Sequence, residues 1–131
     1  SGRIDKALKS CACVTQYCQE RELTLKIIIE SGVFSNMDTL YLAARSLIDM
    51  GVDFLKTSTG TIKQGACLGA AFTLLSAIKD ARSECGIKIS GGVKTPEQAR
   101  NYARLAALML DKPINKKWFR IGASSLLDHF I

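Results

Sequence analysis

Four short strand-like segments recur along the chain at nearly equal spacing, and this repeat limits the folds that the chain can adopt. A strand followed by a helix takes about 30 residues. Four such βα units with parallel strands are therefore predicted within the 131 residues. The predicted strands cover residues 23–30, 53–59, 87–90 and 119–123, so that their starts lie 30, 34 and 32 residues apart.

Apolar residues at helical spacing fill the gaps between the strands. Two helix starts are recognisable in the sequence. Ser35 followed by Asp38 indicates one, and Thr95 with Gln98 three residues later forms the pattern of a capping box. The predicted helices lie at residues 3–20, 40–48, 68–78, 99–110 and, as a short final helix, 124–130.

Each predicted strand has one polar and one apolar face. Basic residues stand on the first face, and residues such as Leu55, Ile87 and Ile89 stand on the second. Helices cover both faces of an open doubly wound sheet, so both faces of its strands are apolar. A polar inner face with an apolar outer face is typical of a (βα)8 barrel. The pattern favours the barrel, with a flavodoxin-like open sheet as the alternative.

A complete barrel of this type needs eight βα units and about 250 residues. Because the chain has four predicted units, we interpret residues 1–131 as one segment, half of a TIM barrel. Its two unpaired strand edges and apolar flank favour association. We therefore expect that it is not a stable monomer, and that the complementary half or a copy of itself completes it.

Composition argues against several classes of function. The net charge of +6 is scattered along the chain with few aromatic residues, which argues against a nucleic-acid interface. No apolar run approaches the roughly 20 residues of a membrane span, and no signal-peptide pattern opens the chain. The five cysteines form no CxxC pair and no histidine has metal-ligand spacing, so we expect a cytoplasmic protein without a metal site.

Two lysines, Lys56 and Lys88, stand at matching positions of consecutive predicted strands. An ordinary lysine has a pKa near 10.4, so only about one in 2,500 is a free amine at pH 7. Burial and a neighbouring cation both lower this pKa, and inward lysines on adjacent strands lie close enough for the second effect. The pair therefore predicts a nucleophilic amine that forms Schiff bases with carbonyl compounds.

Lys26 and Glu30 occupy the same face of the preceding strand. Lys26 adds a third inward cation, for which the alternative is an apolar stem packed in the barrel with its ammonium group in water. Glu30 suits an acid, a base or a counter-ion, and equally a residue that neutralises charge near the end of the strand.

Glycine-containing turns follow the last two predicted strands. Gly91 and Gly92 follow the third strand, and Gly122 with Ser124 and Ser125 follows the fourth. Backbone N–H groups at such turns bind phosphate together with a helix N-terminus, and barrels often hold phosphate in the loops after their last strands. The turns therefore predict a phosphorylated substrate, with Lys94 adding a positive charge.

Four motifs resemble those of deoxyribose-phosphate aldolase, and they occur here as LKIIIESG (25–32), DFLKTSTG (53–60), KISGGVKT (88–95) and RIGASSLL (120–127). The resemblance spans nearly the whole chain but only the C-terminal half of that family's barrel. It implies a class I aldolase that cleaves 2-deoxy-D-ribose 5-phosphate to acetaldehyde and glyceraldehyde 3-phosphate, without a metal or other cofactor. The complementary piece would then be the N-terminal half.

The resemblance also implies roles for individual residues. Lys56 falls on the Schiff-base lysine, Lys88 on a second lysine that tunes its pKa, and Lys26 on a further active-site lysine. The phosphate-binding loops correspond to Gly60, Gly91, Gly92, Val93, Lys94, Gly122, Ser124 and Ser125.

The chain departs from the family pattern in three places. Thr61 stands where the family usually has a lysine, and Lys63 is a candidate substitute. The family's active-site aspartate belongs to an earlier strand, and its C-terminal tail with a tyrosine has no counterpart in these residues. Two alternatives therefore stay open, a non-catalytic half-barrel that serves as a binding or scaffold module, and another phosphate-binding barrel enzyme.

Overall fold

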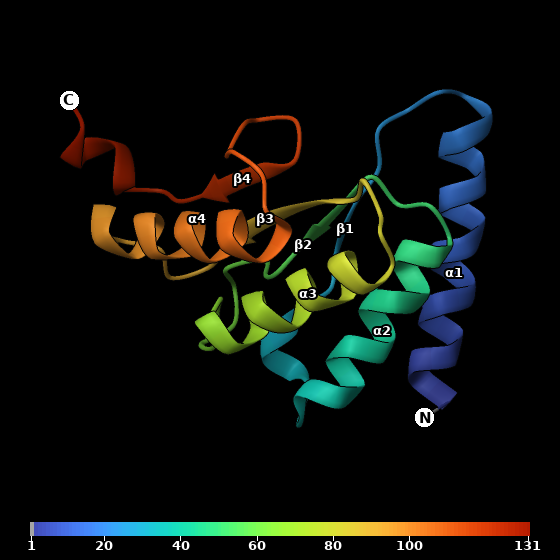
Figure 1. Cartoon of the computed structure of the whole chain (residues 1–131). Coiled ribbons are helices and arrows are strands. Elements are labelled where there is room, and N and C mark those ends of the chain that lie inside the picture. Colours follow the sequence, from blue (N-terminus) through green and yellow to red (C-terminus); the bar gives the residue numbers. More distant parts are fainter. Residues whose placement is uncertain (1) are drawn as a thin grey trace.

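The computed structural model describes residues 2–131, in which a leading helix is followed by four strands (Figure 1). Each of the first three strands leads to an α-helix, and the fourth leads to a short 3-10 turn. The strands are β1 (Lys26–Ile28), β2 (Phe54–Lys56), β3 (Gly86–Ser90) and β4 (Phe119–Gly122). The α-helices are α1 (Gly2–Glu20), α2 (Met37–Asp49), α3 (Leu68–Asp80) and α4 (Pro96–Leu110), and two 3-10 turns are η1 (Ser31–Val33) and η2 (Leu126–His129).

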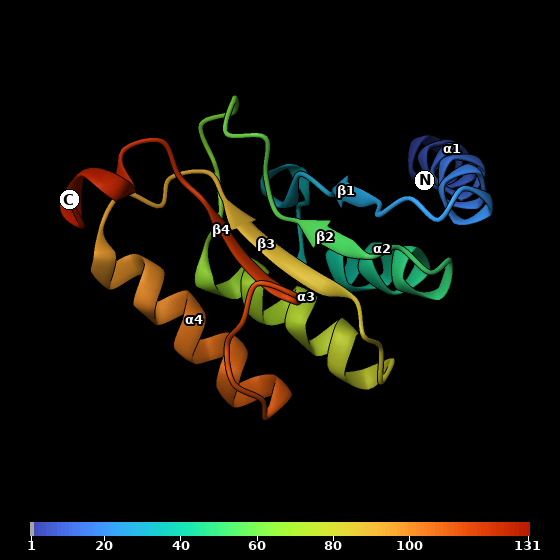
Figure 2. The same ribbon diagram turned by 90° about the horizontal axis from the view of Figure 1, so that it is seen from above.

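The four strands are parallel and lie in the order β1-β2-β3-β4. Seen from above, α2, α3 and α4 lie on the same side of the sheet, and α1 lies beyond the β1 edge (Figure 2). An open doubly wound sheet has helices on both faces and a change in strand order. The observed arrangement is that of half a barrel, so the prediction of the fold is confirmed and the flavodoxin-like alternative is wrong.

The core lies between the sheet and its helices. Leu55, Ile87 and Ile89 leave the sheet on this side and are at most 1% exposed. They pack in one cluster with buried residues of the helices, namely Leu40, Ala44, Leu47, Ala71, Leu74, Leu75, Ile78 and Ala106. Burial of this apolar face is what fixes the direction of the other face, since alternate residues of a strand point to opposite sides.

The helix ends agree with the sequence at α4 and differ at α2. Thr95 caps α4, and its side chain and that of Gln98 form a complete capping box. For α2 the predicted cap at Ser35 is wrong, because Asn36 is the extended residue before the helix and its Oδ1 accepts a 2.8 Å hydrogen bond from the Thr39 N–H. Predicted residues 124–130 form only the short turn η2.

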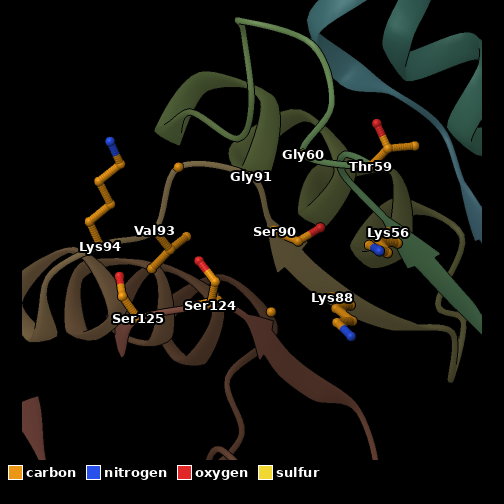
Figure 3. Close-up of a pocket in the computed structure, with 13 residues that line it drawn as sticks. Lys56, Thr59, Gly60, Lys88, Ser90, Gly91, Val93, Lys94, Ser124 and Ser125 are labelled. Carbon is orange, nitrogen blue, oxygen red and sulfur yellow. The ribbon is translucent and has the colours of Figure 1, made fainter. Parts of the chain in front are cut away.

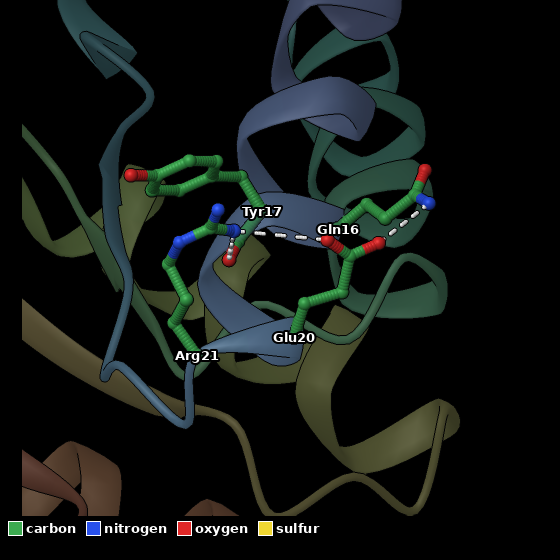
Figure 4. Close-up of polar contacts among 4 residues, drawn as sticks. All are labelled: Gln16, Tyr17, Glu20 and Arg21. Atoms are coloured by element: carbon green, nitrogen blue, oxygen red, sulfur yellow. Dashed lines mark hydrogen bonds and ion pairs between the residues drawn. The ribbon is translucent and has the colours of Figure 1, made fainter.

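The first predicted strand is shortened at both ends. Glu22 and Glu30 both have left-handed backbone conformations, with φ of 54° and 50°, so the extended segment between them is limited. Before this segment, residues at the C-terminal end of α1 contact one another on the surface (Figure 4). The Arg21 guanidinium lies 3.6 Å from the centroid of the Tyr17 ring and 3.7 Å from Glu20 Oε2.

The face of the sheet opposite the helices is uncovered in residues 2–131, and β1 and β4 are its two edges. Ile28 stands on this face with 42% of its surface exposed. No helix among these residues has the length and apolarity that a membrane crossing requires. The uncovered face is the one that carries the basic residues of the strands.

Candidate active site

Lys56 and Lys88 are direct neighbours across the β2–β3 pair, because their Cα positions are partners in the strand register. Adjacent strands are about 4.8 Å apart, so both side chains leave the same face of the sheet at the same height. Figure 3 shows them next to each other, with Gly60 and Gly91 above them and Ser124 to one side of Lys88. The structure thus brings together the two lysines that the sequence singled out.

The pKa of Lys88 is lowered from its ordinary value, first by burial and then by the positive charges of Lys26, Lys56 and Arg120. Gly122 on β4 makes room for this side chain. A Cβ at position 122 would lie 2.8 Å from Lys88 Cε and 3.5 Å from its Nζ. Burial and cationic neighbours, the two causes considered in the sequence analysis, therefore both lower the pKa of Lys88.

Lys26 lies on the same face but at a lower level than the lysine pair. Its register partner is Phe54, whereas Ile28 is the β1 residue level with Lys56. Lys26 is exposed and is not among the residues that line the cleft described below. Its position is consistent with a charge that acts on Lys88 from a distance, and a direct role in the site stays a prediction.

Phe54 and Arg120 were not selected by sequence reasoning, although they stand on the inner face. The Arg120 guanidinium lies 4.2 Å from the centroid of the Phe54 ring, and its Nε donates to the Lys116 carbonyl. Phe54 is buried although it stands on the face that carries the basic residues. The sequence could have indicated this, because Phe54 lies two residues before Lys56 in the same strand and therefore points to the same face. Its aromatic ring lies one level below the lysines.

A cleft of about 530 Å³ opens above the lysine pair at the carboxyl ends of β2, β3 and β4. It contains Lys56, Lys88 and all eight residues of the predicted phosphate loops. Three further residues line it that sequence reasoning had not selected, Thr59, Ser90 and Ala123, each of which belongs to a quoted motif. The complete lining is Lys56, Thr59, Gly60, Lys88, Ser90, Gly91, Gly92, Val93, Lys94, Gly122, Ala123, Ser124 and Ser125.

Glycines allow the loops after β2 and β3 to touch through their backbones. The Ala66 N–H donates to the Gly91 carbonyl at 3.0 Å, and a Cβ at Gly65 would lie only 2.4 Å from that oxygen. Gly91 and Gly92 have φ of 89° and 80°, which disfavours any residue with a side chain. The wall of the cleft is therefore exposed backbone, which suits close approach of an anion.

Two cations of the loops have different positions. Lys94 lines the cleft, whereas Lys63, the candidate substitute for the lysine missing at Thr61, does not. The N–H groups of Lys94 and Thr95 both donate to Gln98 Oε1, at 2.8 and 3.1 Å. These two N–H groups at the N-terminus of α4 are therefore already hydrogen-bonded within the chain. Lys94 can still contribute to anion binding through the positive charge of its side chain.

Acidic groups lie outside the cleft in the part of the chain that the structure describes. Glu30 accepts hydrogen bonds from Thr59 and is not a lining residue. Within residues 2–131 no three His, Cys, Asp or Glu side chains are grouped as a metal site would require. The described cleft therefore combines two lysines, hydroxyl groups and glycine-rich turns.

Comparison with known proteins gives the same picture. A sequence model of DeoC/LacD family aldolases matches residues 3–131. A protein from Coccidioides immitis described as a deoxyribose-phosphate aldolase is 22% identical, with a TM-score of 0.77 over 98% of this chain and 46% of its own. Deoxyribose phosphate aldolase from Aeropyrum pernix, a tetramer, is 25% identical, with a TM-score of 0.70 over 97% of this chain and 50% of its own.

The chain therefore spans about half the length of the solved structures that it matches. The structural matches support the half-barrel, and the sequence model covers almost every residue. The lysine pair and the glycine-lined cleft lie within the matched range. The chain belongs to the DeoC/LacD aldolase family.

Proposed function

We propose that this chain supplies the Schiff-base half of an aldolase site that cleaves 2-deoxy-D-ribose 5-phosphate to acetaldehyde and glyceraldehyde 3-phosphate. The observation that carries the proposal is the in-register pair Lys56 and Lys88 on the floor of the cleft. Schiff-base formation needs a free amine. The lowered pKa of Lys88 favours loss of a proton from this pair of lysines and so supports the proposal.

In the proposed reaction the Lys56 amine attacks the aldehyde carbon of the open-chain sugar, and loss of water leaves an iminium ion. The C2–C3 bond then breaks, with its electrons passing to the iminium to form an enamine, while the C3 hydroxyl loses its proton and becomes the aldehyde of glyceraldehyde 3-phosphate. Protonation of the enamine and hydrolysis release acetaldehyde and restore the amine. Lys88 shares or relays the proton of Lys56, and Lys26 contributes charge.

The phosphate of the substrate would lie against the turns at Gly60, Gly91–Gly92 and Gly122, with Lys94 and the hydroxyl groups of Ser124 and Ser125 around it. These residues line one continuous cleft with the lysines. Backbone N–H groups at such turns and a nearby ammonium group are a common arrangement for binding phosphate. The predicted residues support the proposal because they converge from three different loops.

A complementary N-terminal half-barrel is the partner that we propose, because the chain covers about half of its relatives. Pairing with a second copy is less favourable. It would place two sets of Lys26, Lys88 and Arg120 in one lumen, while the inner strand positions of residues 2–131 carry no acidic side chain. The partner would also supply the proton acceptor for the C3 hydroxyl.

The absence of a carboxylate from the described cleft favours one alternative, a half-barrel that binds a phosphorylated ligand without turnover. Schiff-base formation separates the two functions, because it needs only groups that this chain contains. Purified chain would be incubated with acetaldehyde and borohydride, and the reduced adduct located by mass spectrometry. The proposal expects an ethyl group on Lys56, lost in Lys56→Ala and retained in the control Lys63→Ala, whose lysine lies outside the cleft.

An adduct on Lys88 in place of Lys56 would exchange the roles of the two lysines. No adduct on either would contradict the aldolase proposal. Binding of inorganic phosphate without any adduct would be the result expected of the non-catalytic binding module.

A further inference from the structure

Glu30 follows β1 and has a left-handed backbone conformation, with φ of 50° and ψ of 61°. Residues other than glycine rarely adopt this conformation. The backbone ladder to β2 continues on both sides of it. The Ile29 N–H donates to the Lys56 carbonyl at 2.9 Å, and the Ser31 N–H donates to the Thr57 carbonyl at 2.7 Å. The side chain of Glu30 is therefore held next to the end of β2, where the loop toward α3 begins.

The carboxylate of Glu30 binds both donors of Thr59. The Thr59 N–H lies 3.3 and 3.2 Å from the two carboxylate oxygens, and the Thr59 hydroxyl donates to Oε2 at 2.6 Å. Hydrogen bonds to a charged acceptor are short and about twice as strong as neutral ones. The Glu30 side chain, two residues beyond β1, thus continues the connection between the two segments past the last hydrogen bond between their backbones.

The hydroxyl of Thr59 is fully used in this arrangement. Its one hydrogen goes to Glu30, so the 2.7 Å contact with Thr61 Oγ1 has Thr61 as the donor. The Thr61 N–H also donates to Thr59 Oγ1, at 3.2 Å. Gly60 lies between these two threonines with φ of 89° and lines the cleft.

We propose that Glu30 is a positioning residue, which acts through Thr59 to hold Gly60 and the β2 wall of the cleft in the geometry that binds the phosphoryl group. The inference rests on the proposed function for the identity of that group. The clamp itself, defined as Glu30, Thr59 and Thr61, rests only on the hydrogen bonds above. It gives Glu30 a role other than acid, base or counter-ion.

The clamp is tested first without ligand, by amide hydrogen exchange and chemical shifts of the purified chain. Glu30→Ala removes both acceptors, and we expect the Thr59 amide to lose its protection and the Gly60 resonance to shift. Glu30→Gln keeps one acceptor oxygen and should preserve most of the protection. Glu84→Gln is the matched control, because Glu84 is an exposed glutamate at the opposite end of the strands. Unchanged Thr59 and Gly60 amides in Glu30→Ala would overturn the clamp.

The link to the site is tested by titration with inorganic phosphate. We expect Glu30→Ala to weaken phosphate binding by roughly three- to tenfold, since the loop must then be ordered on binding. Glu30→Gln should restore affinity to within about twofold, and Thr59→Val should fall between the two. The melting temperature is measured in parallel, and a loss of stability with unchanged phosphate affinity would reduce Glu30 to a structural residue and overturn the proposal.

The two proposals fail in different ways. If the unaltered chain binds no phosphate, the phosphate cleft of the proposed function is wrong, and the positioning role falls with it even if the exchange data show the clamp. If phosphate binds and Glu30→Ala does not alter its affinity, the positioning role alone is wrong.

Discussion

Thr57 and Ser90 bind each other through two hydrogen bonds, one in each direction and both of 2.9 Å. The Ser90 N–H donates to Thr57 Oγ1, and this hydroxyl donates to the Ser90 carbonyl. Thr57 is completely buried. Because Ser90 lines the cleft, this exchange joins the end of β2 to the end of β3 directly beside the lysine pair.

Replacement of Thr57 by valine keeps the shape of the side chain and removes both hydrogen bonds. The Ser90 N–H and carbonyl would then lose buried partners, and we expect the free energy of unfolding to fall by about 1–3 kcal/mol. Urea denaturation measures this change. Thr73→Val is the matched control, because the Thr73 hydroxyl donates only to the Gly69 carbonyl within α3. Equal losses in the two variants would contradict the importance of the link.

Gly122→Ala should impair the lysine pair without a strained backbone. A methyl group there would come within 2.8 Å of Lys88 Cε, so the Lys88 side chain must move. We expect the rate of borohydride trapping with acetaldehyde to fall roughly tenfold or more, because small displacements of reacting groups have large effects on rate. Gly69→Ala is the control, since a Cβ there meets only Cys67 Sγ at 4.0 Å. An unchanged trapping rate in Gly122→Ala would show that the position of Lys88 does not matter.

Lys88→Met should stabilise the protein at neutral pH. The folded state lowers the pKa of Lys88, and in the unfolded chain this lysine titrates near 10.4. Between these values the unfolded chain binds more protons, so the stability of the unaltered protein rises with pH across the window. The variant should therefore exceed the unaltered protein in stability by the full amount at pH values below the folded-state pKa of Lys88. This difference should shrink as the pH rises toward the unfolded-state pKa. Thermal melts from pH 6 to 10 measure this trend, with Lys9→Met as the control, and a pH-independent difference would contradict it.

Association of two copies should strengthen as salt is added. The inner faces of both copies carry Lys26, Lys88 and Arg120, and salt screens the repulsion between them. Lys26→Gln combined with Arg120→Gln should strengthen association at low salt for the same reason. Sedimentation equilibrium measures both effects. Association that weakens with salt would mean that the copies meet through another surface.

Most of the fold could be predicted from the sequence because it depends on short-range patterns. The spacing of the strands, the apolar faces of the helices and the capping box at Thr95 and Gln98 are all visible within one or two elements. The two lysines could be paired for the same reason, since equivalent positions on consecutive parallel strands are brought level by hydrogen bonding. The loops after the strands then collect at one edge of the sheet.

Only the tertiary structure decided how charge and space are distributed around that edge. It placed Lys26 below the lysine pair, put the lowered pKa on Lys88, and turned Glu30 away from the cleft onto Thr59. These outcomes depend on the register of the strands and on the left-handed backbone at Glu30. A shift of the register by one residue would therefore alter them. Strand periodicity determines which face a side chain leaves, whereas its height, its neighbours and its solvation depend on how the strands and loops pack.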